Sequence, residues 1–240
     1  MPTLEINVPG ECHLNRTAER AFLTVRVSTE SPKQEEAAEN ATNTVNSLHQ
    51  LFRELSPKTE SGGATPEAAV TLFTIGSIST SSAIPLDDKG KTTGPRKYSA
   101  YATISAIFRD FAKLSMVISQ LFMMPFVEVE RIDWRLTEET IQVLAKEAQK
   151  KALLDAIEKA AVYAEVVGRE VFLVEINDEG GYSSTGRTKQ TNTRNLTRGG
   201  QGGGGMDSID LEPQEIVLSS SIKTVFATTE WKKPISLSLY

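Results

Sequence analysis

A long alanine-rich helix that leads directly into a strand constrains the fold of this chain more than any other feature. Residues 137–167 are predicted to form this helix, with Thr137 as the N-cap, two glutamates in the first turn and Gly168 as the C-terminal cap. The residues that share one face are small or apolar: Ile141, Ala145, Ala148, Ala152, Ala156, Ala160, Tyr163 and Val167. Small side chains allow close approach, so we predict that this face lies on a sheet. No catalytic role is needed to explain the unit.

The remaining regular elements are predicted from hydrophobic periodicity. Alternating apolar and polar residues, or β-branched runs, predict strands at 4–8, 20–27, 67–82, 98–108, 126–136, 170–176 and 213–228. One helix is predicted over 31–55, with Ser31 as the N-cap, Pro32 at the first helical position and Gln34 completing a capping box. A second helix is predicted over 110–122, with Asp110 as its N-cap. Both helices carry an apolar stripe that is expected to face a sheet.

The composition is that of a globular protein with no general affinity for polyanions. The 240 residues carry a net charge of −5, whereas nucleic-acid-binding domains usually present a basic face. The first residues show no secretory signal pattern, and no segment approaches the ~18 apolar residues of a membrane span. Cys12 is the single cysteine, so an internal disulfide is impossible. These features predict a protein of the cytoplasm or the nucleus.

Residues 179–211 are rich in Gly, Ser, Thr and Asn, and we expect them to form a flexible loop. Positions 180–205 contain no acidic residue, and the basic residues there are Arg187, Lys189, Arg194 and Arg198. Arginine beside flexible glycine resembles segments that bind RNA loosely, but no aromatic residues are interleaved with these four cations. The four side chains are therefore the candidates for a polyanion contact, while a solvated linker is the interpretation that the pattern favours.

Three residues could supply a nucleophile, a base or a metal ligand. Cys12 and His13 are adjacent on a predicted strand, so their side chains point to opposite faces and cannot pair. His49 has no second histidine at helical spacing, which excludes a metal pair on that helix. It lies one position beyond the apolar stripe, and we expect it at the rim of the core. An ordinary surface or core role is the better interpretation for all three.

The remaining motifs also have structural explanations. The carboxylate pairs Asp87 with Asp88 and Glu138 with Glu139 lack the apolar neighbours that would divide them into an acid and a base. A "GKT" at residues 90–92 lacks the first glycine of a phosphate-binding loop and precedes a strand. The run "GQGGGG" does not open a helix. We therefore predict no catalytic, cofactor-binding or metal-binding residues and no cofactor.

Four phrases in their order resemble the SIMPL domain family. They are "ERAFLTVRVSTES", "YSAYATISAIFRDFAKLSMVISQL", "AKEAQKKALLDAIEKAAVYAEVVGREV" and "PQEIVLSSSIKTVFA". The resemblance covers nearly the whole chain except residues 80–97 and 180–210. Two departures are "MMP" at 123–125, where the family turns with small residues and glycine, and a longer glycine-rich loop. Bacterial relatives are exported, whereas the first residues of this chain show no export signal. The chain therefore resembles a cytosolic, eukaryotic member of the family.

The resemblance implies an α+β fold in which helices lie as one layer on antiparallel sheet. It also implies two subdomains: a main one from residues 1–80 and 137–240, containing the loop 180–210, and an inserted β-α-β one from residues 98–136. The family brings no catalytic motif; its members have been associated with oxidative-stress defence and with kinase signalling. We therefore favour a non-catalytic assembly or interaction module. An enzyme with an unrecognised site, first at Cys12 or the Asp87–Asp88 loop, and an RNA binder through residues 187–198 remain alternatives.

The expected partner is a second copy of the chain. The stretches 71–82 and 215–227 are long strands with few charges, and a strand at a sheet edge usually needs charges, proline or a cover to prevent pairing. If either strand lies at an edge, pairing with another copy would satisfy its backbone groups. The alternative is that both strands are central and already covered. A homo-oligomer is thus predicted, with other protein partners open.

Overall fold

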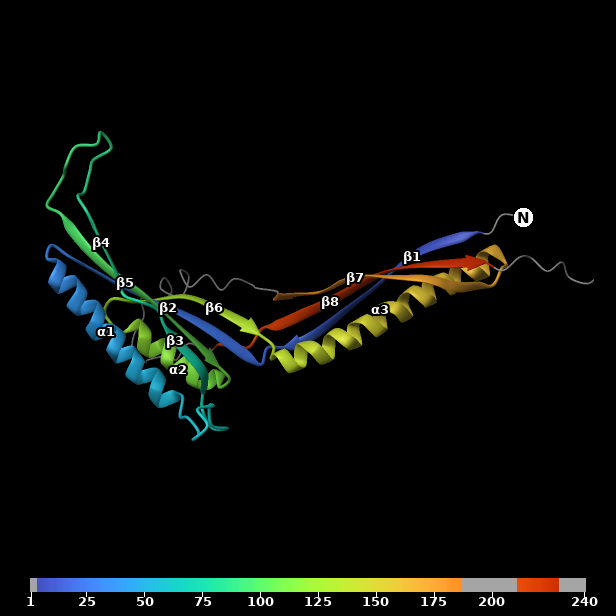
Figure 1. Cartoon of the computed structure of the whole chain (residues 1–240), viewed down its shortest axis with the longest axis horizontal. Coiled ribbons are helices and arrows are strands. Elements are labelled where there is room, and N and C mark those ends of the chain that lie inside the picture. The colour runs from blue at the N-terminus through green and yellow to red at the C-terminus, as the bar shows by residue number, and fades with distance from the viewer. Residues whose placement is uncertain (1–3, 187–210, 229–240) are drawn as a thin grey trace, which may run out of the picture. The chain divides into compact units, whose positions relative to one another are not determined.

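The computed structural model describes residues 4–186 and 211–228, and for residues 179–186 it describes the backbone alone. The chain forms two compact units, and the described residues of these units contain three helices and eight strands in two antiparallel sheets (Figure 1). Among the described residues, the first unit comprises 4–17, 136–186 and 215–228, and the second comprises 18–135 and 211–214. Helices packed on antiparallel sheets place the chain in the α+β class, which confirms the predicted fold class.

The first unit is a three-stranded antiparallel sheet with one long helix on it. Its strands are β1 (Glu5–Thr17), β7 (Val171–Gly186) and β8 (Glu215–Thr228), in the spatial order β1-β8-β7. β1 and β8 pair without interruption from Glu5 opposite Ala227 to Thr17 opposite Glu215. β7 pairs with the other side of β8, with register shifts between Leu173 and Glu175 and between Asp178 and Tyr182. β8 is therefore the central strand.

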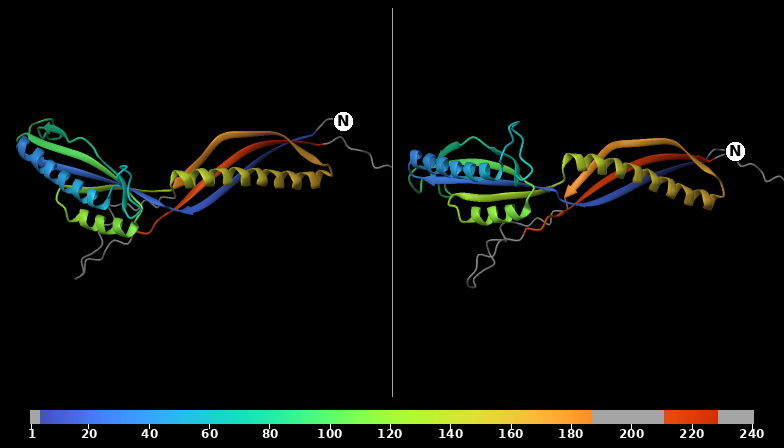
Figure 2. Two further views of the ribbon diagram at one scale, coloured as in Figure 1. Left: turned by 60° about the horizontal axis from the view of Figure 1, so that its bottom comes forward. Right: turned by 90° about the horizontal axis from the view of Figure 1, so that it is seen from below.

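The helix of this unit is α3 (Glu138–Val167), which runs along the sheet (Figure 2). The side chain of Thr137 accepts a hydrogen bond from the Thr140 N–H, and Gly168 takes the left-handed conformation (φ 64°), so both predicted caps are confirmed. The alanines of the predicted face are buried, and they are Ala145, Ala148, Ala152, Ala156 and Ala160. Tyr163 and Val167 are exposed instead, because Ala160 already packs with Phe226, close to the end of the β1–β8 pairing.

The second unit is a β-α-β-β-β-α-β arrangement, which becomes β-α-β-β-α-β when the short edge strands β3 and β4 are counted as one. Its elements are β2 (Arg20–Ser31), α1 (Gln34–Leu55), β3 (Val70–Ile75), β4 (Ser79–Ala83), β5 (Lys97–Phe108), α2 (Phe111–Phe122) and β6 (Val127–Arg135). The strand order is β3-β5-β2-β6, with β4 also paired to β5. β5 and β6 therefore flank β2, and the connection between them through α2 spans that strand. This order is the ferredoxin-like split β-α-β topology.

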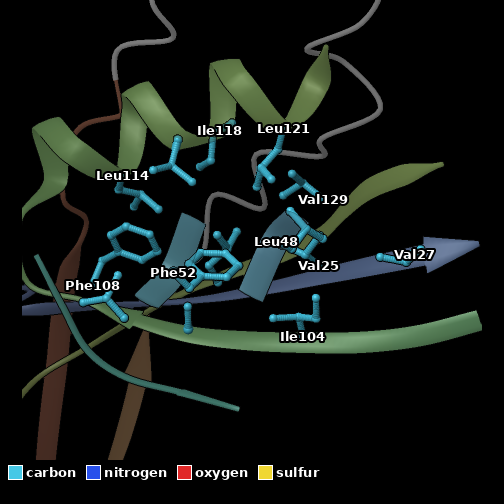
Figure 3. Packing of buried hydrophobic residues seen from close by; sticks show 14 of the residues in the cluster. Val25, Val27, Leu48, Phe52, Ile104, Phe108, Leu114, Ile118, Leu121 and Val129 are labelled. Carbon is cyan, nitrogen blue, oxygen red and sulfur yellow. The ribbon is translucent and has the colours of Figure 1, made fainter. Parts of the chain in front are cut away.

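Both helices of the second unit cover one face of its sheet (Figures 1 and 2). Alternate residues of β2, including Leu23, Val25 and Val27, are buried in the same cluster as Leu48 and Phe52 of α1. Figure 3 shows Leu48 and Phe52 on the same side of the sheet as Leu114, Ile118 and Leu121 of α2, and all of these residues belong to one continuous core. The apolar faces of the strands and of the two helices thus pack against each other in one core, as the sequence predicts.

The units divide the chain differently from the expected subdomains. β2, α1 and β3 belong with residues 97–135 and not with the terminal elements, because β2 is hydrogen-bonded to both β5 and β6. An insertion limited to residues 98–136 would lack its central strand. The unit built from sequence-distant elements is instead β1 with α3, β7 and β8.

Three predicted boundaries also differ from the structure. α1 begins at Gln34 with Lys33 as its N-cap, because Ser31 ends β2; the Ser31 hydroxyl accepts from the Lys33 N–H and donates to Glu36. The single strand expected at 67–82 is two strands, interrupted where the Gly76 N–H donates to the Thr103 carbonyl oxygen. Residues 179–186, expected in a flexible loop, belong to β7 through backbone pairing with β8, and residues 187–210 of the expected loop lie outside the described residues.

Candidate functional site

The outer edge of β1 is capped by side chains of α3. The Glu11 N–H donates a hydrogen bond of 2.8 Å to Asp155, and the Pro9 carbonyl oxygen accepts one of 3.2 Å from the Lys159 ammonium group. Pro9 itself has no N–H to donate, which is why proline in a strand indicates a sheet edge. The Pro9 carbonyl and the Glu11 N–H, in the middle of β1, are therefore already satisfied, and this part of the edge is protected against pairing with another strand.

Asp155 and Lys159 also form an ion pair with each other, at 2.7 Å. The hydrogen bond from Lys159, followed by that from the Glu11 N–H, lowers the pKa of Asp155 below its ordinary value. The hydrogen bond to Asp155 raises the pKa of Lys159 above its ordinary value. Both groups are thus charged over a wide pH range, and each holds the other against the β1 backbone. Helical periodicity puts Asp155 and Lys159 outside the alanine face and does not reveal this role.

The outer edge of β7 lies at the opposite side of the same sheet. Among the described residues, β8 is the single strand that pairs with β7. The first residues of β7 carry one charge, that of Glu175, and no proline. Three apolar side chains project from this stretch, with exposed fractions of 50% for Phe172, 59% for Val174 and 49% for Ile176. We call residues 171–177 the open edge.

The open edge has the properties that favour association with a further strand. Val174 is the extra residue at the first register shift and lies outside the ladder to β8; a bulge of this kind opposes pairing locally, so a further strand would pair with the regular residues on either side of it. The backbone groups on the outer side of a sheet-edge strand are available to another strand, and the exposed side chains add apolar area that association would bury. Sequence reasoning missed this edge, although "VFLVEIN" with its single charge was the available signal.

The two strands that the sequence analysis singled out as candidate edges have different positions. β8 is central and paired on both sides, so it offers no edge. β3 and β4 do lie at an edge of the second unit, where both pair with β5. β3 has six residues and β4 five, and short edge strands are a common protection against pairing. The opposite edge of that sheet, β6, is rich in charged residues.

The face of the second sheet that the helices leave uncovered carries aromatic and arginine side chains. The Arg135 guanidinium lies 4.5 Å from the centroid of the Phe22 ring, and that of Arg26 lies 5.8 Å from the Tyr101 ring. Arg26 also pairs with Glu130 at 3.6 Å. A platform for stacking bases needs accessible rings beside cations that can bind phosphate. These rings and cations are engaged with each other and with acidic residues, so this face does not suit that purpose.

The sequence candidates for catalysis and metal binding lie on β1, on α1 and in the turn at Asp87. Cys12 and His13 lie on opposite faces of β1, as expected, with His13 hydrogen-bonded to Ser219 at 2.8 Å. His49 is exposed at the rim of the core, 5.8 Å from the Phe73 ring. Asp87 accepts hydrogen bonds from two backbone N–H groups of its own turn. Within residues 4–186 and 211–228, no three His, Cys, Asp or Glu side chains gather to hold a metal ion.

The candidate polyanion contacts are four basic residues of the glycine-rich segment. Arg187, Lys189, Arg194 and Arg198 all lie outside the described residues.

Glu138 and Glu139 lie in the first turn of α3 at the positive end of the helix dipole, as predicted. In the described part of the chain, no helix is long and apolar enough to cross a membrane.

Comparisons with known proteins agree with the resemblance that the sequence motifs indicate. Comparison with curated proteins gives no match. The family model described as "SIMPL: Protein of unknown function (DUF541)" matches residues 6–226. This range spans both units, from the second residue of β1 almost to the end of β8. The chain therefore belongs to the SIMPL family.

Proposed function

We propose that the chain is a non-catalytic self-assembling scaffold or protein-interaction module, and that it assembles through the open edge, residues 171–177. One observation carries the proposal: the three-stranded sheet has one edge capped by Asp155 and Lys159 and another edge with three exposed apolar side chains. A fold that protects one edge of a sheet and leaves the other accessible directs pairing to the accessible edge. The resulting assembly is a homo-oligomer.

Two physical terms support association at this site. A second strand would satisfy the outer N–H and C=O groups of β7, and it would cover Phe172, Val174 and Ile176. Covering apolar area contributes about 25 cal/mol per Å² before the costs of association are subtracted. The family resemblance points toward self-assembly as well, and toward stress response or signalling as the process that such a module serves. We place that role in the cytoplasm or nucleus.

Sedimentation at micromolar concentration tests the proposal. We expect native species heavier than the 26.2 kDa chain. Val174→Lys should return the protein to a single species of that mass, because a lysine on an edge strand opposes pairing. Val143→Lys is the matched control, since Val143 is similarly exposed but lies on α3, and it should leave assembly intact. A native chain that sediments only near 26.2 kDa would overturn the proposal.

Weak RNA binding is a second candidate, which one sequence observation favours. The segment 180–205 carries four basic residues and no acidic residue in a chain of net charge −5. Binding through these cations would weaken steeply with salt, because phosphate contacts release counterions. A joint change of Arg194 and Arg198 to Gln should then reduce both the affinity for single-stranded RNA and its salt dependence. Affinity that is unaffected by this change would exclude the segment as the RNA contact.

A further inference from the structure

We propose that the strand added to the open edge is residues 235–240 of a second copy of this chain. This inference rests on the proposed function and deepens it by naming the partner segment. Residues 229–240, "TEWKKPISLSLY", follow β8 directly and lie outside the described residues.

The pattern of the segment is that of a strand with one apolar face. Ile235, Leu237 and Leu239 alternate with Ser236 and Ser238, so a strand would place all three apolar residues on one side. Pro234 precedes this run, and proline is found at the first position of a strand or before it because it cannot donate to a ladder. The three apolar residues equal in number the three exposed side chains of the open edge.

The position of β8 favours a partner in a second copy over the same chain. β8 ends at Thr228, opposite Val171, where β7 begins. A segment that turned back from this point onto the same molecule would run parallel to β7, since β7 and β8 are antiparallel. The segment of another molecule is free to pair in the antiparallel sense, which is the more stable of the two ladders. Strand addition of this kind draws affinity from the backbone and specificity from alternate side chains.

Charge supports the same pairing. Lys232 and Lys233 precede the apolar run, whereas the charged residues of β7 are Glu175, Asp178 and Glu179, with Glu170 immediately before the strand. A basic stretch beside an acidic strand is complementary, and complementarity fixes register and excludes other partners. The open edge and the segment thus have complementary apolar side chains, backbone groups that can pair in a ladder, and charges of opposite sign.

The first test compares two double variants of the full chain. Leu237→Asp with Leu239→Asp places charge on the apolar face and should raise the dissociation constant of the oligomer at least about tenfold. Ser236→Asp with Ser238→Asp adds the same charge to the other face of the same strand and should leave assembly close to native. Equal effects of the two pairs would overturn the inference, because they would show that no particular face is buried.

The second test locates the contact. In a Cys12→Ser background, a Val174→Cys chain is mixed with a Leu237→Cys chain under mild oxidation. We expect a disulfide-linked heterodimer, because cross-strand residues bring Cβ atoms within bonding reach. A Val143→Cys chain mixed with the same partner is the control and should not be linked. No linkage between residues 174 and 237, in an oligomer that Val174→Lys still disrupts, would overturn the inference and leave the proposed function standing. A monomeric native chain would overturn both.

Discussion

Gly10 of β1 lies directly against the backbone of α3 at Ala152. A Cβ atom added at Gly10 would overlap the Ala152 carbonyl oxygen and lie 2.9 Å from the Cβ of Ala156. Glycine on the strand and alanine on the helix together set the distance between the two elements. The same approach allows Asp155 and Lys159 to reach the backbone of Glu11 and Pro9, so the capped edge depends on this contact.

Replacing Gly10 by Ala should therefore reduce stability by about 1–3 kcal/mol, because a backbone atom of α3 must move to admit the methyl group. Urea denaturation would measure the change. Gly94→Ala is the control, since a Cβ there meets only a Pro85 side-chain atom at 4.0 Å. Equal stability of the two variants would contradict the close packing of β1 on α3.

Enlarging a buried alanine of α3 should have a similar effect. Ala156→Leu overpacks a position with no exposed area, beside Val8 and Phe226, and should cost about 1–3 kcal/mol. Ala161→Leu makes the same substitution on an exposed position of the same helix and should be nearly neutral. An unchanged melting temperature for Ala156→Leu would count against the burial of this face.

Loss of the β1 cap should be visible in hydrogen exchange. Asp155→Asn exchanges a charged acceptor for a neutral one, so the Glu11 N–H that now donates to the carboxylate should exchange faster with deuterium. Glu147→Gln is the control, because it breaks the comparable pair with Lys151 on the same helix. It should leave the Glu11 amide unchanged, and a similar acceleration in both variants would point to general loosening of α3.

The contribution of this cap to stability should depend on pH in a definite sense. The pKa of Asp155 is lowered from 3.8 by Lys159 and the Glu11 N–H, so its stabilisation is complete above pH 3.8 and is lost as the pH falls through the lowered value. The pKa of Lys159 is raised from 10.5 by Asp155, so its stabilisation is complete below pH 10.5 and is lost above the raised value. Denaturation of native and Asp155→Asn chains should thus differ at neutral pH and converge in acid.

The connection between β7 and β8 can be shortened only up to a limit. A short Gly-Ser linker in place of residues 188–209 should change stability by roughly 1 kcal/mol or less, since closure entropy varies slowly with loop length. Replacing residues 182–207 should cost more, because it removes the pairing of Tyr182 with Ser220 and of the residues after it. Chemical denaturation of the two variants would separate these outcomes, and equal stability would show that the end of β7 contributes little.

Phe126 adopts a left-handed backbone conformation, with φ of 66°. Its position follows "MMP", where the family resemblance leads one to expect small residues and glycine. Phe126→Gly should be more stable than Phe126→Ala by about 1 kcal/mol, because both lose the ring but only glycine adopts this conformation without steric cost. The two melting temperatures check this, and an alanine variant at least as stable would argue against strain at this turn.

Local patterns determined most of the elements correctly. The α3 helix with its Thr137 and Gly168 caps, the Asp110 cap of α2 and the alternate burial of β2 all follow from neighbours within a few residues. The four family phrases were likewise readable in the chain, and the match over residues 6–226 agrees with them. Side-chain periodicity and capping depend on residues close in sequence, so they can be recognised before the fold is known.

Strand order was decided by tertiary structure alone. A period-2 pattern is the same in a central strand and in an edge strand. The pattern alone therefore does not show that β8 is central and β7 is at the edge; the hydrogen-bonded neighbours decide this. The division into units differs from the predicted subdomains for the same reason. β2 pairs with β5 and β6, which are distant from it in sequence. The cap on β1 and the open edge on β7 depend on which backbone groups remain outside the ladders, and only the assembled sheet determines that.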